Sequence, residues 1–167
     1  FWWFIFHSQS SNAKLKLMEE GEILLRTIMA MFLGGFVGFE REIAGKPAGI
    51  RTHMFVAGAA TLLLLLSSEV IEQLSATNEN IQADPTRVLE AIVVGISFIG
   101  AGIIFKSAEK QHVYYLTTAS SILFTAAIGI AVALEMFATA LALATITVVV
   151  SAGIGKLEDD HFKHRKK

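Results

Sequence analysis

Basic and hydroxyl side chains are concentrated in two stretches of this chain, within residues 40–53 and 106–118. Together these side chains could bind an anion. Arginine and lysine donate charge-assisted hydrogen bonds to phosphate or carboxylate oxygens, and the free amides at the start of a helix attract the same groups. Thr117 or Thr118 is well placed to cap such a helix. Ordinary anchoring of basic side chains to lipid headgroups explains the same pattern. The candidate ligand-binding or partner-binding residues are Glu40, Arg41, Arg51, Thr52, His53, Gly100, Gly102, Lys106, Thr117 and Thr118.

Acidic residues form a second candidate site between positions 69 and 90. Carboxylate oxygens are preferred ligands of Mg²⁺, so Asp84 and Glu90 are candidate metal ligands. Glu90 is the more unusual of the two, because an acid inside a membrane span is costly unless it is paired or faces water. Solvated charges at the rim of a bundle explain the same residues more simply, with Asp84 capping a helix that begins near Pro85. We expect no cofactor, and Mg²⁺, an anion or a lipid phosphate remains the candidate ligand.

Small residues mark where helices can approach each other closely. Gly34 and Gly38 form a GxxxG pair, and Gly95 begins a small-residue stretch in the third apolar span. In lipid, close backbone approach through such residues drives helix association. Gly100 and Gly102 would weaken a helix by about 1 kcal/mol each relative to alanine, which permits a local break or a close backbone contact.

Five apolar stretches must position these residues. A bilayer core ~30 Å thick needs about 20 apolar helical residues. The whole chain is 53% hydrophobic and 17% charged, whereas soluble domains carry about 25% charged residues. Glu135 alone interrupts the last apolar region, and because one helix through it would be about 60 Å long, a turn is expected there. The predicted spans are Glu22–Phe39, Met54–Leu74, Val88–Phe105, Leu116–Leu134 and Met136–Gly155.

The predicted fold is therefore an all-α integral membrane bundle of five transmembrane helices. Residues 1–21 form a tail that is either interfacial or not native, residues 22–155 form the membrane domain, and residues 156–167 form a charged tail. The loops are too short to build a second core. The chain has no cysteine, which excludes disulfides and thiolate metal sites.

The distribution of basic residues predicts the orientation. Ten lysines and arginines fall on the side of the C-terminus, and Lys14, Lys16, Arg26 and Arg87 fall on the other side. Since cytoplasmic loops carry the excess of positive charge, the C-terminus is expected in the cytoplasm and the N-terminus outside. The expected location is the bacterial inner membrane.

Several ordered motifs resemble the membrane domain of the MgtC/SapB family. They are the stretches 38–42, 45–53, 84–87, 95–104 and 116–119, so the resemblance covers roughly Glu22 to Gly155. It implies a five-helix membrane domain with its N-terminus outside and an association with growth in low magnesium. For some members it also implies virulence through survival inside host cells, and modulation of the proton-driven ATP synthase as a membrane-protein partner.

Three departures from the family pattern stand beside these matches. Many relatives carry a soluble C-terminal domain, which we expect this chain to lack. Tyr115 stands where a glycine commonly precedes the Leu-Thr-Thr motif, and Glu90 and Val94 differ from the expected residues of the third span.

Regulation is the function that these observations favour. We expect a non-enzymatic protein that binds another membrane protein, because no nucleophile–base pair, metalloprotease motif or phosphate loop is present. The alternative is a small homo-oligomeric ion transporter or channel. A dimer through the glycine face is the favoured oligomer, lipid is an obligatory partner, and nucleic acid is not an expected one.

Overall fold

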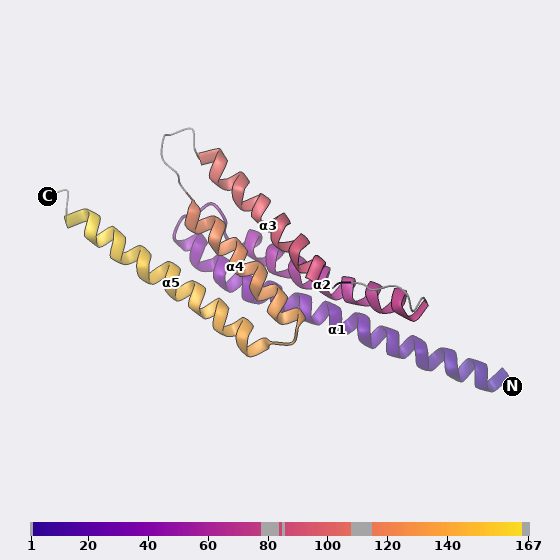
Figure 1. Cartoon of the computed structure of the whole chain (residues 1–167). Coiled ribbons are helices and arrows are strands. Elements are labelled where there is room, and N and C mark those ends of the chain that lie inside the picture. The colour runs from indigo at the N-terminus through magenta and orange to yellow at the C-terminus, as the bar shows by residue number, and fades with distance from the viewer. Residues whose placement is uncertain (1, 78–83, 85, 108–114, 165–167) are drawn as a thin grey trace.

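Five helices account for nearly all of the chain that this computed structural model describes, namely residues 2–77, 84, 86–107 and 115–164 (Figure 1). The described residues contain no strand. The predicted all-α bundle of five helices is therefore confirmed. In chain order the helices are α1 (Trp2–Ile43), α2 (Ile50–Thr77), α3 (Thr86–Ser107), α4 (Leu116–Ala133) and α5 (Phe137–His164).

Four of these helices contain segments long and apolar enough to cross a membrane. The segments are Glu20–Ile43, Ile50–Ile71, Thr86–Phe105 and Leu116–Ala133. The apolar part of α5, Phe137–Gly153, is shorter and lies at the lower limit of about 17 residues for a span. Helix α1 begins at Trp2, well before its predicted start, because glycine and proline are absent from residues 2–20.

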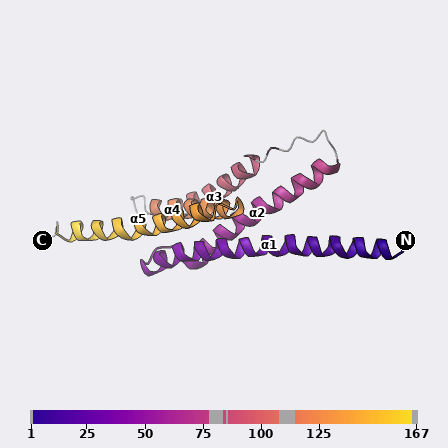
Figure 2. The ribbon, with the colours of Figure 1, turned by 90° about the horizontal axis from the view of Figure 1, so that it is seen from below.

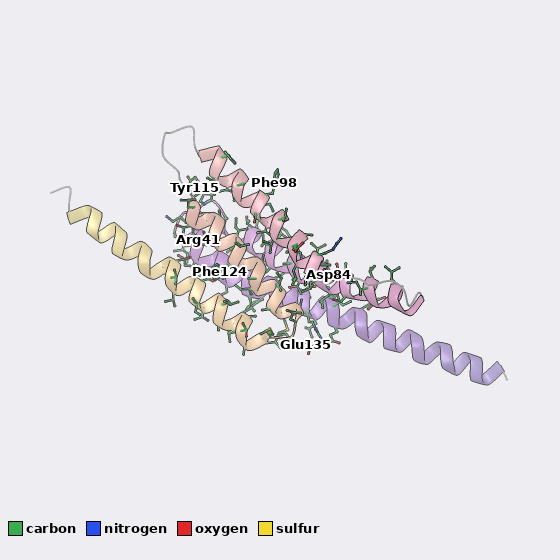
Figure 3. The ribbon with its side chains drawn as sticks, viewed as in Figure 1. Arg41, Asp84, Phe98, Tyr115, Phe124 and Glu135 are labelled. Atoms are coloured by element: carbon green, nitrogen blue, oxygen red, sulfur yellow. The ribbon has the colours of Figure 1, made fainter. Side chains whose placement is uncertain are left out.

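The two chain ends lie at opposite ends of the molecule (Figures 1 and 2). Arg41 and Tyr115 lie toward one end of the bundle, and Asp84 and Glu135 lie toward the other (Figure 3). We call these the Arg41 end and the Glu135 end.

The core lies between α1, α2 and α4, and α5 packs against α1 and α4. Over half of the spanning segment of α4 is buried, whereas only 11% of the corresponding segment of α3 is buried. Helix α3 packs on α4 and α2 but leaves Phe98 82% exposed (Figure 3). Helix α4 is thus the central helix, and α3 presents most of its surface to the surrounding lipid or to another protein.

Two tight turns set the directions of α2 and α5. Gly45 ends α1 with a φ of 65°, and Lys46 N donates to Arg41 O at 3.0 Å. Glu135 has a φ of 61°, and Met136 N donates to Ala131 O at 2.9 Å. Both are Schellman-type helix ends, which normally favour glycine at the left-handed position. The predicted turn at Glu135 is confirmed.

An ion pair fastens the second turn to α1. Arg26 Nη2 lies 2.6 Å from Glu135 Oε1, and Arg26 Nη1 donates to Ala133 O at 3.2 Å. Arg26 also pairs with Glu22 one helical turn earlier. The guanidinium therefore bridges α1 to the end of α4 and holds Glu135 in its strained conformation.

Arg26→Ala is expected to lower the stability of the purified protein by about 1 kcal/mol, because partly exposed ion pairs and one hydrogen bond each contribute modestly. Thermal unfolding in detergent measures the change. Glu22→Gln is the matched control, since it leaves the Glu135 pair in place. Equal melting temperatures for Arg26→Ala and Glu22→Gln would contradict a fastening role for the Glu135 pair.

Candidate functional site

A buried arginine joins the end of α1 to the start of α4. Arg41 lies in the last turn of α1 and is only 2% exposed. Its Nη2 donates to Thr118 Oγ1 at 3.0 Å, across 77 residues of sequence. The Arg41 Nε atom is buried and has no hydrogen-bond partner. A buried donor on a charged group costs free energy when it is unpaired, so this position calls for an acceptor.

A buried histidine joins α2 to the same part of α4. His53 is fully buried, with Nδ1 2.9 Å from Gly49 O and Nε2 3.3 Å from Ser121 Oγ. The Ser121 hydroxyl also lies 2.8 Å from Thr118 O. Because Gly49 O can only accept, Nδ1 carries a proton. With a neutral imidazole, His53 Nε2 and Thr118 O then compete for the single hydroxyl proton of Ser121.

These four residues form one polar cluster, which we call the Arg41 cluster: Arg41, His53, Thr118 and Ser121. It links the three core helices α1, α2 and α4. Buried polar networks of this kind fix a unique packing when all members are satisfied. Here the network is incomplete at Arg41 Nε, and Glu40 Oε2 on the neighbouring residue is also buried without a partner.

Glycines on α1 allow α2 to approach closely enough to build the cluster. A Cβ atom on Gly34 would lie 2.4 Å from His53 O, and one on Gly38 would lie 2.6 Å from Ile50 Cα. No real Cβ makes such contacts, so both positions require glycine. The GxxxG pair thus packs within the chain, against α2, and this face is occupied rather than open to a second copy.

Two further glycines allow neighbouring helices to pack closely with α4. A Cβ on Gly129 would lie 2.3 Å from Ala57 O, and Thr61 Oγ1 donates to Gly129 O at 2.8 Å beside it. A Cβ added to Gly100 of α3 would lie 3.3 Å from the Cβ of Ala119 in α4. The predicted close backbone contact at Gly100 is present, and α3 runs through 100–102 as a continuous helix without a break.

Other predicted site residues lie outside this cluster. Cβ atoms added to Gly95 or Gly102 would meet nothing within 4 Å among the described residues. Arg51 is exposed and Thr52 half-buried in the first turn of α2. Thr117 is exposed next to Thr118. Lys106 lies in the last turn of α3, and Lys110, one of the basic residues used to predict orientation, lies outside the described residues.

The predicted helix cap at Thr117 or Thr118 is wrong. Helix α4 begins at Leu116, and the residue before it is Tyr115, which has a φ of 68° and provides no side-chain cap. The Leu-Thr-Thr run therefore lies inside the first turn rather than before it. This placement frees the Thr118 hydroxyl to accept from Arg41.

The described acidic residues at the Glu135 end do not form a group that could bind a metal ion. Thr86 donates from its hydroxyl and its amide to Asp84 Oδ1, at 2.6 and 2.9 Å, and these bonds lower the pKa of Asp84. The carboxylate thus stabilises the start of α3. Glu90 is exposed on α3. Among the described residues, no group of three or more histidines, aspartates or glutamates could hold a metal ion.

Sequence reasoning missed two features of the site. Ser121 completes the cluster, and Glu135 pairs with Arg26. Ser121 lies one turn after Thr117 and Thr118, so the helical repeat was a signal for it. Arg26 and Glu135 lie near the same predicted membrane boundary, and opposite charges in that position tend to pair.

Comparison with known proteins identifies the family. The profile of the MgtC family matches residues 27–160. The chain is 33% identical over 129 residues to "Putative magnesium transporter YhiD" of Escherichia coli strain K12, which covers 77% of this chain and 59% of that protein. It is 39% identical over 123 residues to protein MgtC of Brucella abortus, covering 74% of this chain and 47% of the relative.

A cyanobacterial relative extends the comparison. Protein SrpB of Synechococcus elongatus is 29% identical over 141 residues, covering 80% of this chain and 75% of SrpB. No solved structure matches the chain. The chain spans about half of the length of YhiD and of Brucella MgtC. With four membrane-length apolar segments, a fifth shorter one and the family profile over most of its length, the chain is a multi-pass membrane protein that belongs to the MgtC family.

Proposed function

We propose that this chain is a non-enzymatic bacterial inner-membrane protein that binds and regulates another membrane protein when magnesium is scarce. Membership of the MgtC family and the magnesium in the name of YhiD support the connection with that ion. The proton-driven ATP synthase is the partner that the family resemblance suggests. The regulatory role uses the Arg41 end of the bundle.

The observation that carries this proposal is the close packing of the central helices. Helix α2 approaches α1 at Gly34 and α4 at Gly129 so closely that even a methyl group would collide with its backbone. The charge buried between them is the cationic guanidinium of Arg41, which repels Mg²⁺. A tightly packed interior with a buried positive charge supports binding at the surface rather than passage of a cation through the centre.

A homo-oligomeric magnesium transporter is the second candidate. The exposed face of α3, where Phe98 is 82% exposed, is a surface through which a second copy could enclose a pathway. The description of YhiD as a transporter favours this alternative. Its pathway would lie between copies, because the interior of one copy is filled.

The proposed orientation places the Arg41 end in the cytoplasm. Lys46 and Arg51 lie exposed at this end, and the positive-inside rule puts such residues on the cytoplasmic side. A regulated partner would then be contacted from the inner leaflet, at the end of the bundle that carries the Arg41 cluster.

Two assays on the same protein distinguish the candidates. In liposomes that contain the purified chain and a Mg²⁺-sensitive dye, we expect no flux above that of protein-free liposomes. In a strain without its own family member, we expect expression of the chain to support growth in low magnesium. Reproducible Mg²⁺ flux would replace the regulatory proposal by the transporter.

A further inference from the structure

The start of α4 has the features of an anion-binding helix end. Its first backbone bond is Ala119 N to Tyr115 O, and the side chain of Tyr115 does not cap the turn. The amides of Leu116, Thr117 and Thr118 precede that bond, and such amides have no partner within their own helix. They and the helix dipole give this end a partial positive charge.

Arg41 supplies an independent indication of a ligand at this point. Its side chain reaches the first turn of α4 through Thr118 and is 2% exposed (Figure 3). Nε faces no acceptor. Within the described residues, no carboxylate forms an ion pair with Arg41, since the ion pairs found there are those of Arg26. The neighbouring Glu40 carboxylate acts on Arg41 through its charge, but it does not form an ion pair with the guanidinium. The positive charge of Arg41 therefore lies beside this helix end without a directly bonded counterion.

An apolar crevice begins at the same turn. It lies between α4 and α5, has a volume of about 140 Å³, and is lined by Thr117, Ser120, Phe124, Ile146, Val150 and Ser151 among others. The Ser120 hydroxyl donates to Leu116 O at 3.0 Å within its own helix, so the lining of the crevice remains apolar. Figure 1 shows α5 diverging from α4 toward the Arg41 end.

We propose that this end of the bundle binds a phospholipid, with the headgroup phosphate at Arg41 and the α4 amides and one acyl chain in the α4–α5 crevice. Arg41 lies in the last turn of a spanning segment and Leu116 in the first turn of another, so both lie at the membrane boundary where lipid phosphates are found. A phosphate oxygen would accept from the unpaired Nε, and the positive charges complement the negative phosphodiester. The inference deepens the proposed function, on which it rests, by naming a ligand for the Arg41 end.

Native mass spectrometry of the purified, delipidated chain tests this site. The probes are phosphatidylglycerol and a diacylglycerol with the same acyl chains. We expect phosphatidylglycerol to bind about tenfold or more tightly, because only it provides charge-assisted acceptors. Inorganic phosphate at millimolar concentration is not expected to displace it, since phosphate alone cannot fill the crevice. Equal binding of the two lipids, or displacement by inorganic phosphate, would overturn the phospholipid site.

Two variants remove different halves of the site. Arg41→Gln removes the charge, and Ser151→Phe fills the crevice on the α5 side without touching Arg41. Both are expected to lose about tenfold in affinity for phosphatidylglycerol. Arg87→Gln removes an exposed arginine near the Glu135 end and is expected to bind normally. If Ser151→Phe binds as tightly as the unchanged chain, the crevice does not hold an acyl chain and the proposal is overturned.

This test is separate from that of the proposed function. Lipid binding is measured on the purified chain with neither magnesium nor a protein partner present. Failure of the growth assay would therefore leave the lipid result intact, and failure of lipid binding would leave the growth result intact.

Discussion

Gly129→Ala is expected to destabilise the bundle by about 2–3 kcal/mol, the cost typical of overpacking a filled core. The added Cβ would lie 2.3 Å from Ala57 O and 3.0 Å from Ala57 C. Both atoms belong to the backbone of α2, so a side-chain rotation cannot relieve the collision. The helices must separate, which also weakens the bond from Thr61 to Gly129 O.

Gly95→Ala is the matched control for this prediction. Both glycines lie inside helices, and a Cβ at Gly95 would meet nothing within 4 Å of the described residues. Alanine improves helix propensity by about 1 kcal/mol, so Gly95→Ala should be neutral or slightly stabilising. The melting temperatures of both variants in the same detergent provide the comparison. If the two variants have equal melting temperatures, the close approach of α2 and α4 is not what stabilises the core.

Arg41→Ala is expected to abolish the function of the chain while the protein remains folded in the membrane. The substitution deprives Thr118 Oγ1 of its donor and removes the charge at the start of α4. The effect on stability should be smaller, because loss of a buried charge also relieves its desolvation cost. We expect the melting temperature to fall less for Arg41→Ala than for Gly129→Ala.

Arg41→Lys refines the prediction. Lysine keeps the charge but lacks the planar fork of donors that bonds Thr118 and a ligand at the same time. Function should therefore be reduced rather than restored. Size-exclusion profiles of the purified variants establish that each is folded, so that a functional loss is not mistaken for misfolding.

Much of the fold could be predicted because lipid imposes strong rules on sequence. Five apolar stretches and the lone Glu135 were sufficient for five helices and a tight turn, since a continuous apolar stretch of this length satisfies its own backbone hydrogen bonds in a bilayer as a helix. Gly34 and Gly38 were recognisable as packing residues for the same reason. Their partner was not recognisable, because a small-residue pair fits a second copy as well as a neighbouring helix.

The composition of the site was harder to predict. Arg41, His53 and Thr118 were all candidates, but so were exposed neighbours such as Arg51, because residue type alone does not distinguish a buried side chain from one at the rim. Threonine is a common helix cap, but the residue before α4 is Tyr115 in a left-handed conformation, so both threonines lie inside the first turn. Gly102 resembles Gly100 in sequence, yet only Gly100 faces α4, since two residues along a helix turn the side chain by about 200°.

We propose the Arg41 cluster as a binding site in addition to its role in helix packing. Its most direct test is growth in low magnesium, measured at equal membrane abundance, for strains that express Arg41→Ala or Arg87→Ala. We expect Arg41→Ala to fail to support growth while its abundance matches that of the unchanged chain, and we expect Arg87→Ala to grow normally. Normal growth of Arg41→Ala at equal abundance would contradict it.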